Sequence, residues 1–552
     1  MSRATYDVVI IGSGAGGGSS AWSLSKQGFN VLVLEAGPGY DPFSEYDLHS
    51  SSWEAKMFPH KIPTEGRQSY GQMQALSHDK RDLRSWNHIS GLYNDSDRRV
   101  SYGYHHVLGV GGSSLHFTGE AHRMNPKSMR MKSQFGVAAD WPMTYADLDP
   151  YYQIAEETVG VAGPDQDKYR PRSAPYPQQA HALSYASQHL SKGFRKMGLA
   201  LVPNSLAVLS AAKDGRPNCN YCGGCLRGCP RTDKGSIDVT YIRQALKSGK
   251  CEVRPGSRVL KLDTDTHDRI TGVHYVDNTG THFIPCATLI IACGAVETPR
   301  LLLTVKTPSS PNGLANESGE VGKNFMETLL WTSSALHPEP MGSHRGLPVD
   351  SICWDYNTPD AIPNVIGGCR FAPSQAESNL VGSINYATRV VGGWGKPHKA
   401  QMKQAFGNVL SITGIGESLP NSGSNVMLDP NKKDQFDMPL ARINSHLNEM
   451  EIDRLAFMAK TCREILKAAG TGDIFEEFSS YDIFSSTHVF GTCRMGVNPA
   501  TSVVNPWCQS HRWKNLYVID ASVFPSSGGG ESPGLTIQAL ALRACNYIAE
   551  NA

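Results

Sequence analysis

Residues 6–35, with the sequence YDVVIIGSGAGGGSSAWSLSKQGFNVLVLE, decide the fold. The run Tyr6–Ile11 is short, apolar and rich in β-branched residues, which predicts a buried parallel strand. A glycine-rich turn follows it, and the next segment predicts a helix that ends at Gly28. Asn30–Glu35 predicts a second strand, so the three elements form one βαβ unit.

The turn of this unit matches the pattern G-x-G-x-x-G at Gly12, Gly14 and Gly17. Gly12 permits the tight turn, Gly14 lets the backbone approach a pyrophosphate, and Gly17 lets the helix pack close to the strand. The helix N-terminus would present backbone N–H groups to the phosphates. Glu35 ends the second strand, where a carboxylate can accept hydrogen bonds from the adenosine ribose. The motif therefore predicts a dinucleotide site, and by itself it leaves both FAD and NAD open.

The composition indicates an ordinary soluble globular enzyme. Of 552 residues, 40% are hydrophobic and 19% are charged, with 52 Lys and Arg against 51 Asp and Glu. This balance gives no electrostatic reason to expect nucleic acid or an anionic membrane as a partner. The most apolar run, residues 287–296, has only the length of a strand, so we expect no transmembrane helix. We find no signal-peptide pattern and expect a cytoplasmic protein; the alternative is a periplasmic one that is exported together with a signal-bearing partner subunit.

Four further motifs follow in order along the chain. They are GGSSLHF at 111–117, GAVETPRLLL at 294–303, HVFGTCRMG at 488–496, and NLYVIDAS at 515–522 with SPGLTIQA at 532–539. Together with the N-terminal unit, they resemble the glucose–methanol–choline (GMC) oxidoreductase family over nearly the whole chain. Within that family, two features are similar to those of bacterial sugar dehydrogenases that carry an iron–sulfur cluster, such as glucoside 3-dehydrogenase. One is the segment that contains His116, and the other is a group of four cysteines at 219–229, described below.

The resemblance implies an α/β (α+β) fold in which a Rossmann-like FAD-binding domain carries an inserted substrate-binding domain built on a β-sheet. We expect the FAD-binding domain to be discontinuous, made of residues 1–40, 100–125, 235–325 and 485–552. Residues 126–234 would form a helical and irregular segment with the cysteines, and residues 326–484 the substrate-binding domain. Within these parts we expect a helical stretch at 127–170, around the sequence at 144–160, an irregular stretch at 171–235 and a hairpin or meander with a turn at 278–280.

The same resemblance implies FAD rather than a diffusible nicotinamide, and it places further residues around the flavin. The turn with Gly112 and Ser113 would lie against the pyrophosphate or the isoalloxazine. Asp520 and Ala521 would lie near the ribityl chain and the flavin ring, and Gly294 and Ala295 near the cofactor's adenosine part; Val259 is expected as a further cofactor-binding residue. His116 is expected as a polar residue of the flavin pocket; the alternative is that it carries the flavin covalently.

The catalytic residues are expected at His488 and Ser532. A neutral histidine suits the removal of a hydroxyl proton, and His488 matches the catalytic histidine of the family, with Val489 in place of the usual Pro. The second position, normally His or Asn before a Pro, is Ser532, which cannot act as a base near neutral pH. Either Ser532 positions the substrate, or Glu531 or a side chain of another loop takes over, or Ser532 only caps the following helix.

A cysteine cluster lies at 219–230, CNYCGGCLRGCP, among 13 cysteines in all. Cys219, Cys222, Cys225 and Cys229 follow C-x2-C-x2-C-x3-C-P, the spacing of bacterial ferredoxins. This favours an iron–sulfur cluster over a zinc site, whose four cysteines usually split into two separated pairs, and over inert thiols. The resemblance implies a [3Fe–4S] cluster on the spacing of three of them, while Cys222 would complete a [4Fe–4S] cluster; we expect [4Fe–4S], with [3Fe–4S] as the alternative.

These expectations give an FAD-dependent dehydrogenase of a secondary alcohol in a sugar or glucoside, with C3 as the expected carbon and a 3-keto-glycoside as product. Its electrons would leave through the cluster to a quinone, a cytochrome c or a dye. Two alternatives stay open: an oxygen-using sugar oxidase with a structural cluster, and a non-catalytic flavin electron-transfer subunit, which the Ser532 departure supports.

Overall fold

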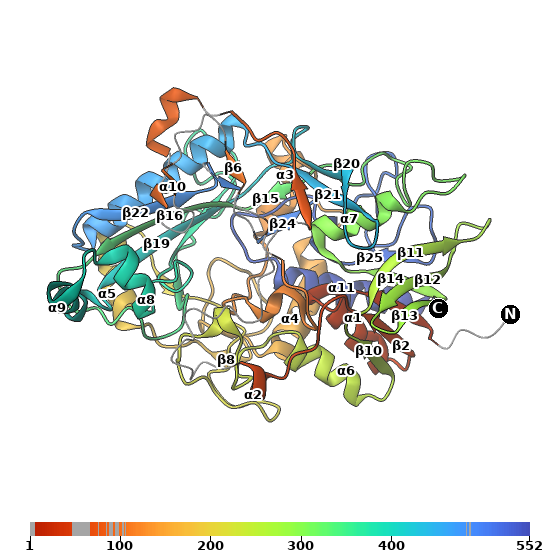
Figure 1. The fold of residues 1–552 in the computed structure, drawn as a ribbon, viewed down its shortest axis with the longest axis horizontal. Coiled ribbons are helices and arrows are strands. Elements are labelled where there is room, and N and C mark those ends of the chain that lie inside the picture. The colour runs from red at the N-terminus through yellow and green to blue at the C-terminus, as the bar shows by residue number, and fades with distance from the viewer. Residues whose placement is uncertain are drawn as a thin grey trace.

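The structure is a computed structural model that describes residues 6–46, 67–75, 77–83, 86–87, 92–93, 99–101, 104, 106–481, 483–484 and 487–551. Two regions are visible in Figure 1, each built on its own sheet. The parallel sheet with both chain ends lies on the right of the view, and the antiparallel sheet beneath α10 lies on the left.

The parallel sheet contains the predicted βαβ unit. Its strands are β1 (Val8–Ile11), β2 (Val31–Leu34), β10 (Cys251–Arg254), β14 (Thr288–Ile291) and β25 (Leu516–Val518), in the order β10-β2-β1-β14-β25. All neighbouring pairs are parallel, and Val8 pairs with Val31 on one side and with Thr288 on the other. The residues of β1 and β2 are buried throughout, which explains why these strands are continuous apolar runs.

Helices from distant parts of the chain cover this sheet. They are α1 (Ala15–Lys26), α4 (Tyr145–Val159), α6 (Arg243–Lys247), α7 (Gly294–Thr304) and α11 (Gly534–Glu550). Helix α1 packs against α11, and α11 packs against α4. Helix α4 is the helix expected near 144–160, and it begins with a capping box between Thr144 and Asp147.

A small antiparallel sheet follows in the chain and confirms the predicted hairpin. It consists of β11 (Arg258–Thr264), β12 (Ile270–Asp277) and β13 (Gly280–Pro285). Asp277 pairs with Gly280 across the turn. Apolar residues of β12 join the same core as the parallel sheet, so this sheet belongs to the same region of the molecule.

The second region is built on an antiparallel sheet of four strands. They are β18 (Cys369–Pro373), β19 (Val409–Gly416), β16 (Leu329–Leu336) and β22 (Ile474–Ser479), in that order. Helix α10 (Glu449–Ala468) packs on β16 and β19, and this helix and the strands share an apolar core separate from that of the first region. In Figure 1, α10 lies along the upper side of this sheet.

The expectation of an irregular stretch at 171–235 is wrong for one segment. Residues 185–196 form α5 (Tyr185–Lys196), which begins at the Ser184 cap and packs against α10. Ala186, Leu190 and Phe194 recur every four residues and are buried in the second core. Polar residues surround these three in the sequence, so the apolar stripe is visible only at helical spacing.

The remaining helices and strands are short or peripheral. They are α2 (Pro42–Glu45), β3 (Gln68–Tyr70), β4 (Trp86–Asn87), β5 (Leu92–Tyr93), β6 (Val100–Ser101), α3 (Met131–Phe135), β7 (Ala162–Gly163), β8 (Gln178–Gln179), β9 (Val202–Pro203), β15 (Met326–Glu327), β17 (Ser351–Ile352), α8 (Ser383–Asn385), α9 (Gly395–Ala405), β20 (Asn425–Lys433), β21 (Pro439–Asn444), β23 (Ile483–Phe484) and β24 (Val489–Phe490). Among the described residues, no helix has the length and apolar character needed to cross a bilayer.

The strands of the parallel sheet come from widely separated segments of the chain. On this basis we propose the discontinuous division stated above, with 1–40, 100–125, 235–325 and 485–552 as the FAD-binding part. We propose 126–234 as the segment that carries the cysteines and 326–484 as the substrate-binding part.

Candidate active site

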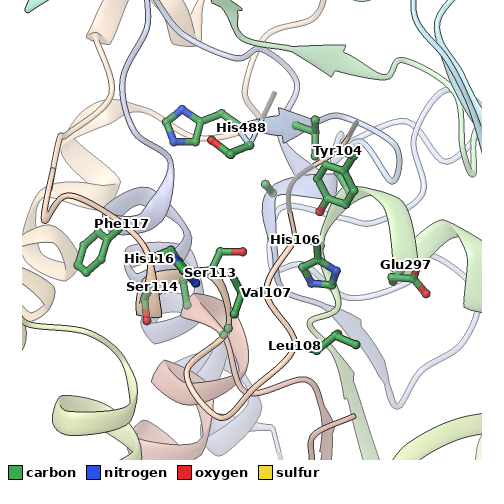
Figure 2. A pocket seen from close by; sticks show the side chains of 18 of the residues that line it. Tyr104, His106, Val107, Leu108, Ser113, Ser114, His116, Phe117, Glu297 and His488 are labelled. Carbon is green, nitrogen blue, oxygen red and sulfur yellow. The ribbon is translucent and has the colours of Figure 1, made fainter. Parts of the chain in front are cut away.

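A cavity of about 1570 Å³ is lined by residues of both regions. This volume exceeds the roughly 300–1,000 Å³ of ordinary small-molecule pockets, as expected for a space that holds a dinucleotide and a substrate together. Most of the predicted cofactor and catalytic residues lie in its wall: Gly12, Gly14, Glu35, Gly112, Ser113, His116, Val259, Gly294, His488, Asp520, Ala521 and Ser532. In Figure 2, His488 lies above the segment with Ser113 and His116, and Glu297 lies on the opposite side of the space.

The glycine turn shapes one end of the cavity. Gly12 has φ +92°, and a Cβ there would lie 2.6 Å from the Ala292 carbonyl oxygen. Gly17 is not part of the wall; a Cβ on it would lie 1.8 Å from the Gly12 carbonyl oxygen, so it serves close packing of the helix, as its place in the motif predicts. No side chain caps the start of α1 at Gly14, which leaves the first N–H groups of the helix available to an anion.

Glu35 lies beside this turn and is 5% exposed. Its Oε2 accepts hydrogen bonds from the Ser13 N–H at 3.0 Å and the Ser13 hydroxyl at 2.6 Å, and its Oε1 accepts one from the Gly37 N–H at 2.9 Å. Burial raises the pKa of the Glu35 carboxyl, and these hydrogen bonds oppose the rise. The carboxylate is therefore held rigidly at the end of β2, where the ribose of a dinucleotide is expected.

Asp520 connects three segments of the wall. Its Oδ2 accepts hydrogen bonds from the Gly294 N–H at 2.9 Å and the Thr298 hydroxyl at 2.6 Å, and its Oδ1 accepts one from the Ser522 N–H at 2.8 Å. Burial raises the pKa of Asp520. The side chain thus fixes the start of α7 and the turn that begins at Ala521 against each other.

His116 ends the 3₁₀ turn Gly112–Leu115 and is 8% exposed. Its Nδ1 lies 2.6 Å from the carbonyl oxygen of Leu226, and because a carbonyl can only accept, Nδ1 carries the proton. The ring is therefore the Nδ1–H tautomer when neutral, with Nε2 as its basic nitrogen. This is compatible with both roles expected of His116, a polar pocket residue and a covalent flavin attachment, which remain predictions.

His488 is half-buried in the cavity wall next to β24. Burial lowers its pKa to about 4, with the Glu120 carboxylate raising it and the Arg370 guanidinium lowering it. The imidazole is therefore neutral at pH 7, the state in which it can accept a proton.

Ser532 does not cap the helix that follows it. The N-cap of α11 is Pro533, without a side-chain hydrogen bond, and the Ser532 hydroxyl instead donates to Glu120 Oε2 at 3.0 Å. Glu531 forms a buried ion pair of 2.6 Å with Arg170 and is not part of the cavity wall. Of the candidates for the second catalytic position, the structure brings Ser532 and Glu120 together at the cavity.

Comparison with known proteins supplies the family. The GMC oxidoreductase models match residues 108–329 and 420–541, which together exceed half of the chain, and a model for an NAD(P)-binding Rossmann-like domain matches residues 10–40. The chain belongs to the GMC oxidoreductase family. It is accordingly an FAD-dependent oxidoreductase that acts on CH–OH groups, and its fold combines the Rossmann-like FAD-binding domain with a substrate-binding sheet domain.

The relatives of this GMC oxidoreductase are enzymes with different substrates in their names. It is 28% identical to a 2-methyl-1,2-propanediol dehydrogenase of Mycolicibacterium austroafricanum, over 98% of this chain and 95% of the relative. It is 27% identical to the fructose dehydrogenase large subunit of Gluconobacter japonicus, over 99% of both. The solved structure of a pyridoxine 4-oxidase from "Mesorbium loti" matches with a TM-score of 0.65 and 17% identity, over 98% of this chain and 99% of that one, which shows a shared fold.

The cysteine segment of this GMC oxidoreductase adjoins the cavity. Lys234 is buried and donates hydrogen bonds to the carbonyl oxygens of Leu115 at 2.9 Å and Cys225 at 2.7 Å, so it joins the flavin-side turn to the cysteine segment. Leu226 and Arg227 belong to the cavity wall, whereas the four cysteines do not.

The four thiols do not form a ready metal site. Cys219 and Cys225 are buried, Cys222 is exposed, and the Cys229 thiol donates to Asp233 Oδ1 at 3.2 Å. Within the part of the chain that the structure describes, no three His, Cys, Asp or Glu side chains are arranged to hold a metal ion. Burial raises the pKa of the Cys219 thiol to about 12. The side-chain arrangement therefore adds no support for a cluster beyond that of the spacing.

Sequence reasoning missed several residues of the site. Glu120 lies three residues after the GGSSLHF segment, and only its position as a lone carboxylate there could have pointed to it. His122, two residues further along the chain, surrounds it in the fold together with Asn204 and Arg370 on β18, which have no local signal because they come from distant parts of the chain. His106, which lies in the cavity wall and stacks on Tyr104, was also not identified.

Proposed function

We propose that this GMC oxidoreductase is a dehydrogenase that oxidises a secondary alcohol of a sugar or glucoside, at C3, to a 3-keto-glycoside. The observation that carries the proposal is the half-buried, neutral His488 in the wall of a cavity whose substrate side is polar. Hydroxyl, amide and charged side chains line that side: Thr328, Thr332, Thr413, Asn379, Asn385, Glu377 and Arg389. A wall of this kind suits a polyhydroxylated substrate, and the choice of C3 follows from the motif resemblance alone.

The chain's own residues supply binding and proton transfer. His488 takes the proton of the reacting hydroxyl as the carbon loses a hydride, and the alcohol becomes a ketone. Bound FAD supplies the acceptor for that hydride. The Glu120 carboxylate favours the imidazolium that forms on His488, and Arg370 keeps this carboxylate ionised. The glycine turn, Glu35 and Asp520 are the residues that would hold the cofactor.

The iron–sulfur cluster remains a proposal that rests on the cysteine spacing. Cys219, Cys222, Cys225 and Cys229 would bind [4Fe–4S], with [3Fe–4S] as the alternative, and Cys229 would have to release its hydrogen bond to Asp233. No catalytic step above depends on the cluster. Its expected role is one-electron transfer to a quinone, a cytochrome c or a dye, and a small signal-bearing subunit is a further expected partner.

Anaerobic flavin reduction tests the reaction. The holoenzyme is mixed with a panel of sugars and glucosides, bleaching is followed at the flavin band, and products are identified by NMR. Reduction by glucosides with a 3-keto product supports the proposal, whereas reduction only by simple alcohols removes the sugar specificity. Dye reduction without hydrogen peroxide favours a dehydrogenase over the oxidase, and no bleaching by any alcohol would favour the non-catalytic subunit.

Iron analysis after anaerobic purification tests the cluster separately. Iron and acid-labile sulfide in the wild type, lost in Cys222→Ser or Cys225→Ser, would support it. Zinc in place of iron, or no metal at all, contradicts it. Flavin reduction by substrate should persist in these variants, because the hydride transfer does not involve the cysteines.

A further inference from the structure

Glu120 is a buried carboxylate at the junction of the two regions. It is 5% exposed, and its Oε2 accepts a hydrogen bond from Arg370 Nη2 at 2.7 Å, with Arg370 1% exposed. Arg370 also donates through Nε to the Gly530 carbonyl oxygen at 2.6 Å, two residues before Ser532. The guanidinium thus holds both the carboxylate and the loop that carries Ser532. Burial alone would raise the pKa of the Glu120 carboxyl, but the adjacent Arg370 guanidinium outweighs it and holds this pKa well below its usual range, so the group accepts hydrogen bonds and cannot donate one.

This carboxylate and three further residues form a closed ring of hydrogen bonds. The Ser532 N–H donates to His122 Nδ1 at 3.1 Å, and His122 Nε2 lies 2.9 Å from Asn204 Oδ1. Asn204 Nδ2 lies 3.1 Å from Glu120 Oε1, and the Ser532 hydroxyl lies 3.0 Å from Glu120 Oε2. Apart from Ser532, at 7%, the members are at most 5% exposed, so water competes little for these bonds.

Two backbone groups fix the direction of every bond in the ring. The Ser532 N–H can only donate, so His122 Nδ1 accepts and its Nε2 carries the proton that goes to Asn204. At the other end, Asn204 Nδ2 also lies 3.2 Å from the Val349 carbonyl oxygen, which can only accept, so the Asn204 amide nitrogen faces Glu120. The remaining bond must then run from the Ser532 hydroxyl to the carboxylate.

The direction of these bonds determines what the Ser532 hydroxyl can offer to the cavity. A serine hydroxyl has one proton, and here Glu120 receives it. The lone pairs of Ser532 Oγ are what remains for a substrate, so the group accepts from it and does not donate. The reacting hydroxyl of the substrate also has one proton, which goes to His488, and it cannot serve Ser532 as well.

We propose that the ring makes Ser532 an acceptor for a second hydroxyl of the substrate, on a carbon next to the oxidised one, with Glu120 as the positioning residue. This rests on the proposed function and narrows its substrate class to alcohols with a neighbouring donor group. It also assigns the serine a recognition role at a position where the family has His or Asn. Simple secondary alcohols lack the second donor and would leave Ser532 unpaired.

Deoxy and fluoro glucosides test the proposal in the holoenzyme. The probes are methyl α-D-glucopyranoside, its 2-deoxy and 4-deoxy forms, and the corresponding fluoro forms, in which fluorine cannot donate. We expect that removing the hydroxyl at one of these two positions, C2 or C4, lowers kcat/KM for flavin reduction about tenfold, which corresponds to the loss of one hydrogen bond. Fluorine at that position should not restore kcat/KM, because fluorine cannot donate a hydrogen bond. In Ser532→Ala this penalty should disappear, with the loss for the parent glucoside mainly in KM. An unchanged penalty in Ser532→Ala overturns the proposal.

The variant Glu120→Gln tests whether the direction of the hydrogen bonds in the ring matters for substrate recognition, or whether the ring only stabilises the fold. Its amide can donate to Ser532, which frees the serine proton to face the cavity, so the fluoro glucoside should gain relative to the parent. A parallel loss for all probes, at normal FAD content, would contradict the role of Glu120. Ser527→Ala is the matched control: Ser527 lies on the same loop, its hydroxyl donates to the Ser418 carbonyl at 2.9 Å, and the ratio between probes should stay that of the wild type.

If no glucoside reduces the wild-type flavin, the proposed function fails. The hydrogen-bond ring is then tested by determining which nitrogen of the neutral His122 imidazole carries the proton. Nitrogen-15 spectra of histidine-labelled protein, with His122→Gln to assign the signal, distinguish the two neutral forms of His122. The Nε2–H tautomer supports the directed ring, and the Nδ1–H tautomer overturns it.

Discussion

At the scale of single residues, His488 carries the strongest expectation. His488→Ala should slow flavin reduction by substrate roughly 10²–10⁴-fold, the usual value of general-base catalysis, because no other neutral imidazole is assigned to the reacting hydroxyl. Anaerobic stopped-flow measures this step directly. FAD content serves as the control and should stay near normal. Wild-type rates in His488→Ala would remove the residue from the catalytic role and move attention to His116.

The pKa of the same residue predicts the pH profile. Burial lowers the pKa of His488 to about 4, and a base is active in its neutral form, so its contribution is complete above that pH and is lost below it. Values of kcat/KM for flavin reduction should therefore be level from about pH 5.5 to 8 and fall toward pH 4. An acid limb centred near the ordinary histidine value of about 6.5 would contradict this environment.

Some residues of the site could be identified from the sequence, and others could not. The glycines, Glu35, Asp520 and His488 belong to local motifs, and all of them except Gly17 line the cavity. The ring around Ser532 could not be found in that way. Its members lie at 120–122, 204 and 532, and only the folding of three separate segments against one another brings them together.

At the scale of elements, the end of β19 contains an acid that should make stability depend on pH. Glu417 is fully buried, accepts a hydrogen bond from the Gly368 N–H at 3.2 Å, and has its pKa raised to about 7, mainly by burial. The folded state therefore holds this proton more tightly than the unfolded state. Its stabilising contribution is complete below the unfolded pKa of about 4.5 and is lost as the pH rises through about 7.

Glu417→Gln should remove that dependence. Between pH 5 and 8 the variant should lose less unfolding free energy than the wild type, by up to roughly 3 kcal/mol. Urea unfolding at several pH values measures this, and Glu339→Gln, at an exposed glutamate, is the control. Equal slopes for wild type and Glu417→Gln would show that the buried carboxyl does not titrate in this range.

The elements themselves divide into those with a local signal and those without one. The βαβ unit, the hairpin at 278–280 and α4 have signals within a few residues: an apolar run, a turn and a capping box. The segment of α5 has an apolar stripe diluted by polar residues, and its helix depends on packing against α10. The pairing of β14 with β25 joins residues more than 200 positions apart, and no local pattern contains that information.

At the scale of the whole molecule, a buried ion pair and the cavity join the two regions. Arg370 on β18 pairs with Glu120, and a second pair nearly excluded from water, Arg170 with Glu531, joins the segment that carries the cysteines to the loop before α11. Removing one partner would leave an uncompensated buried charge, which typically costs about 3–5 kcal/mol. The regions are therefore expected to unfold together rather than one after the other.

FAD should strengthen this coupling, because its cavity has walls from both regions. For FAD that dissociates, binding to the folded state alone adds about 2.7 kcal/mol at a free concentration one hundred times Kd. Calorimetry of the deflavinated and reconstituted protein should thus show one transition, whose midpoint rises with free FAD. Acid precipitation must first release the yellow colour into the supernatant, since flavin that stays with the pellet would mean attachment through His116. A midpoint independent of FAD, or two separate transitions in the holoprotein, would show that the cofactor does not bridge the two regions.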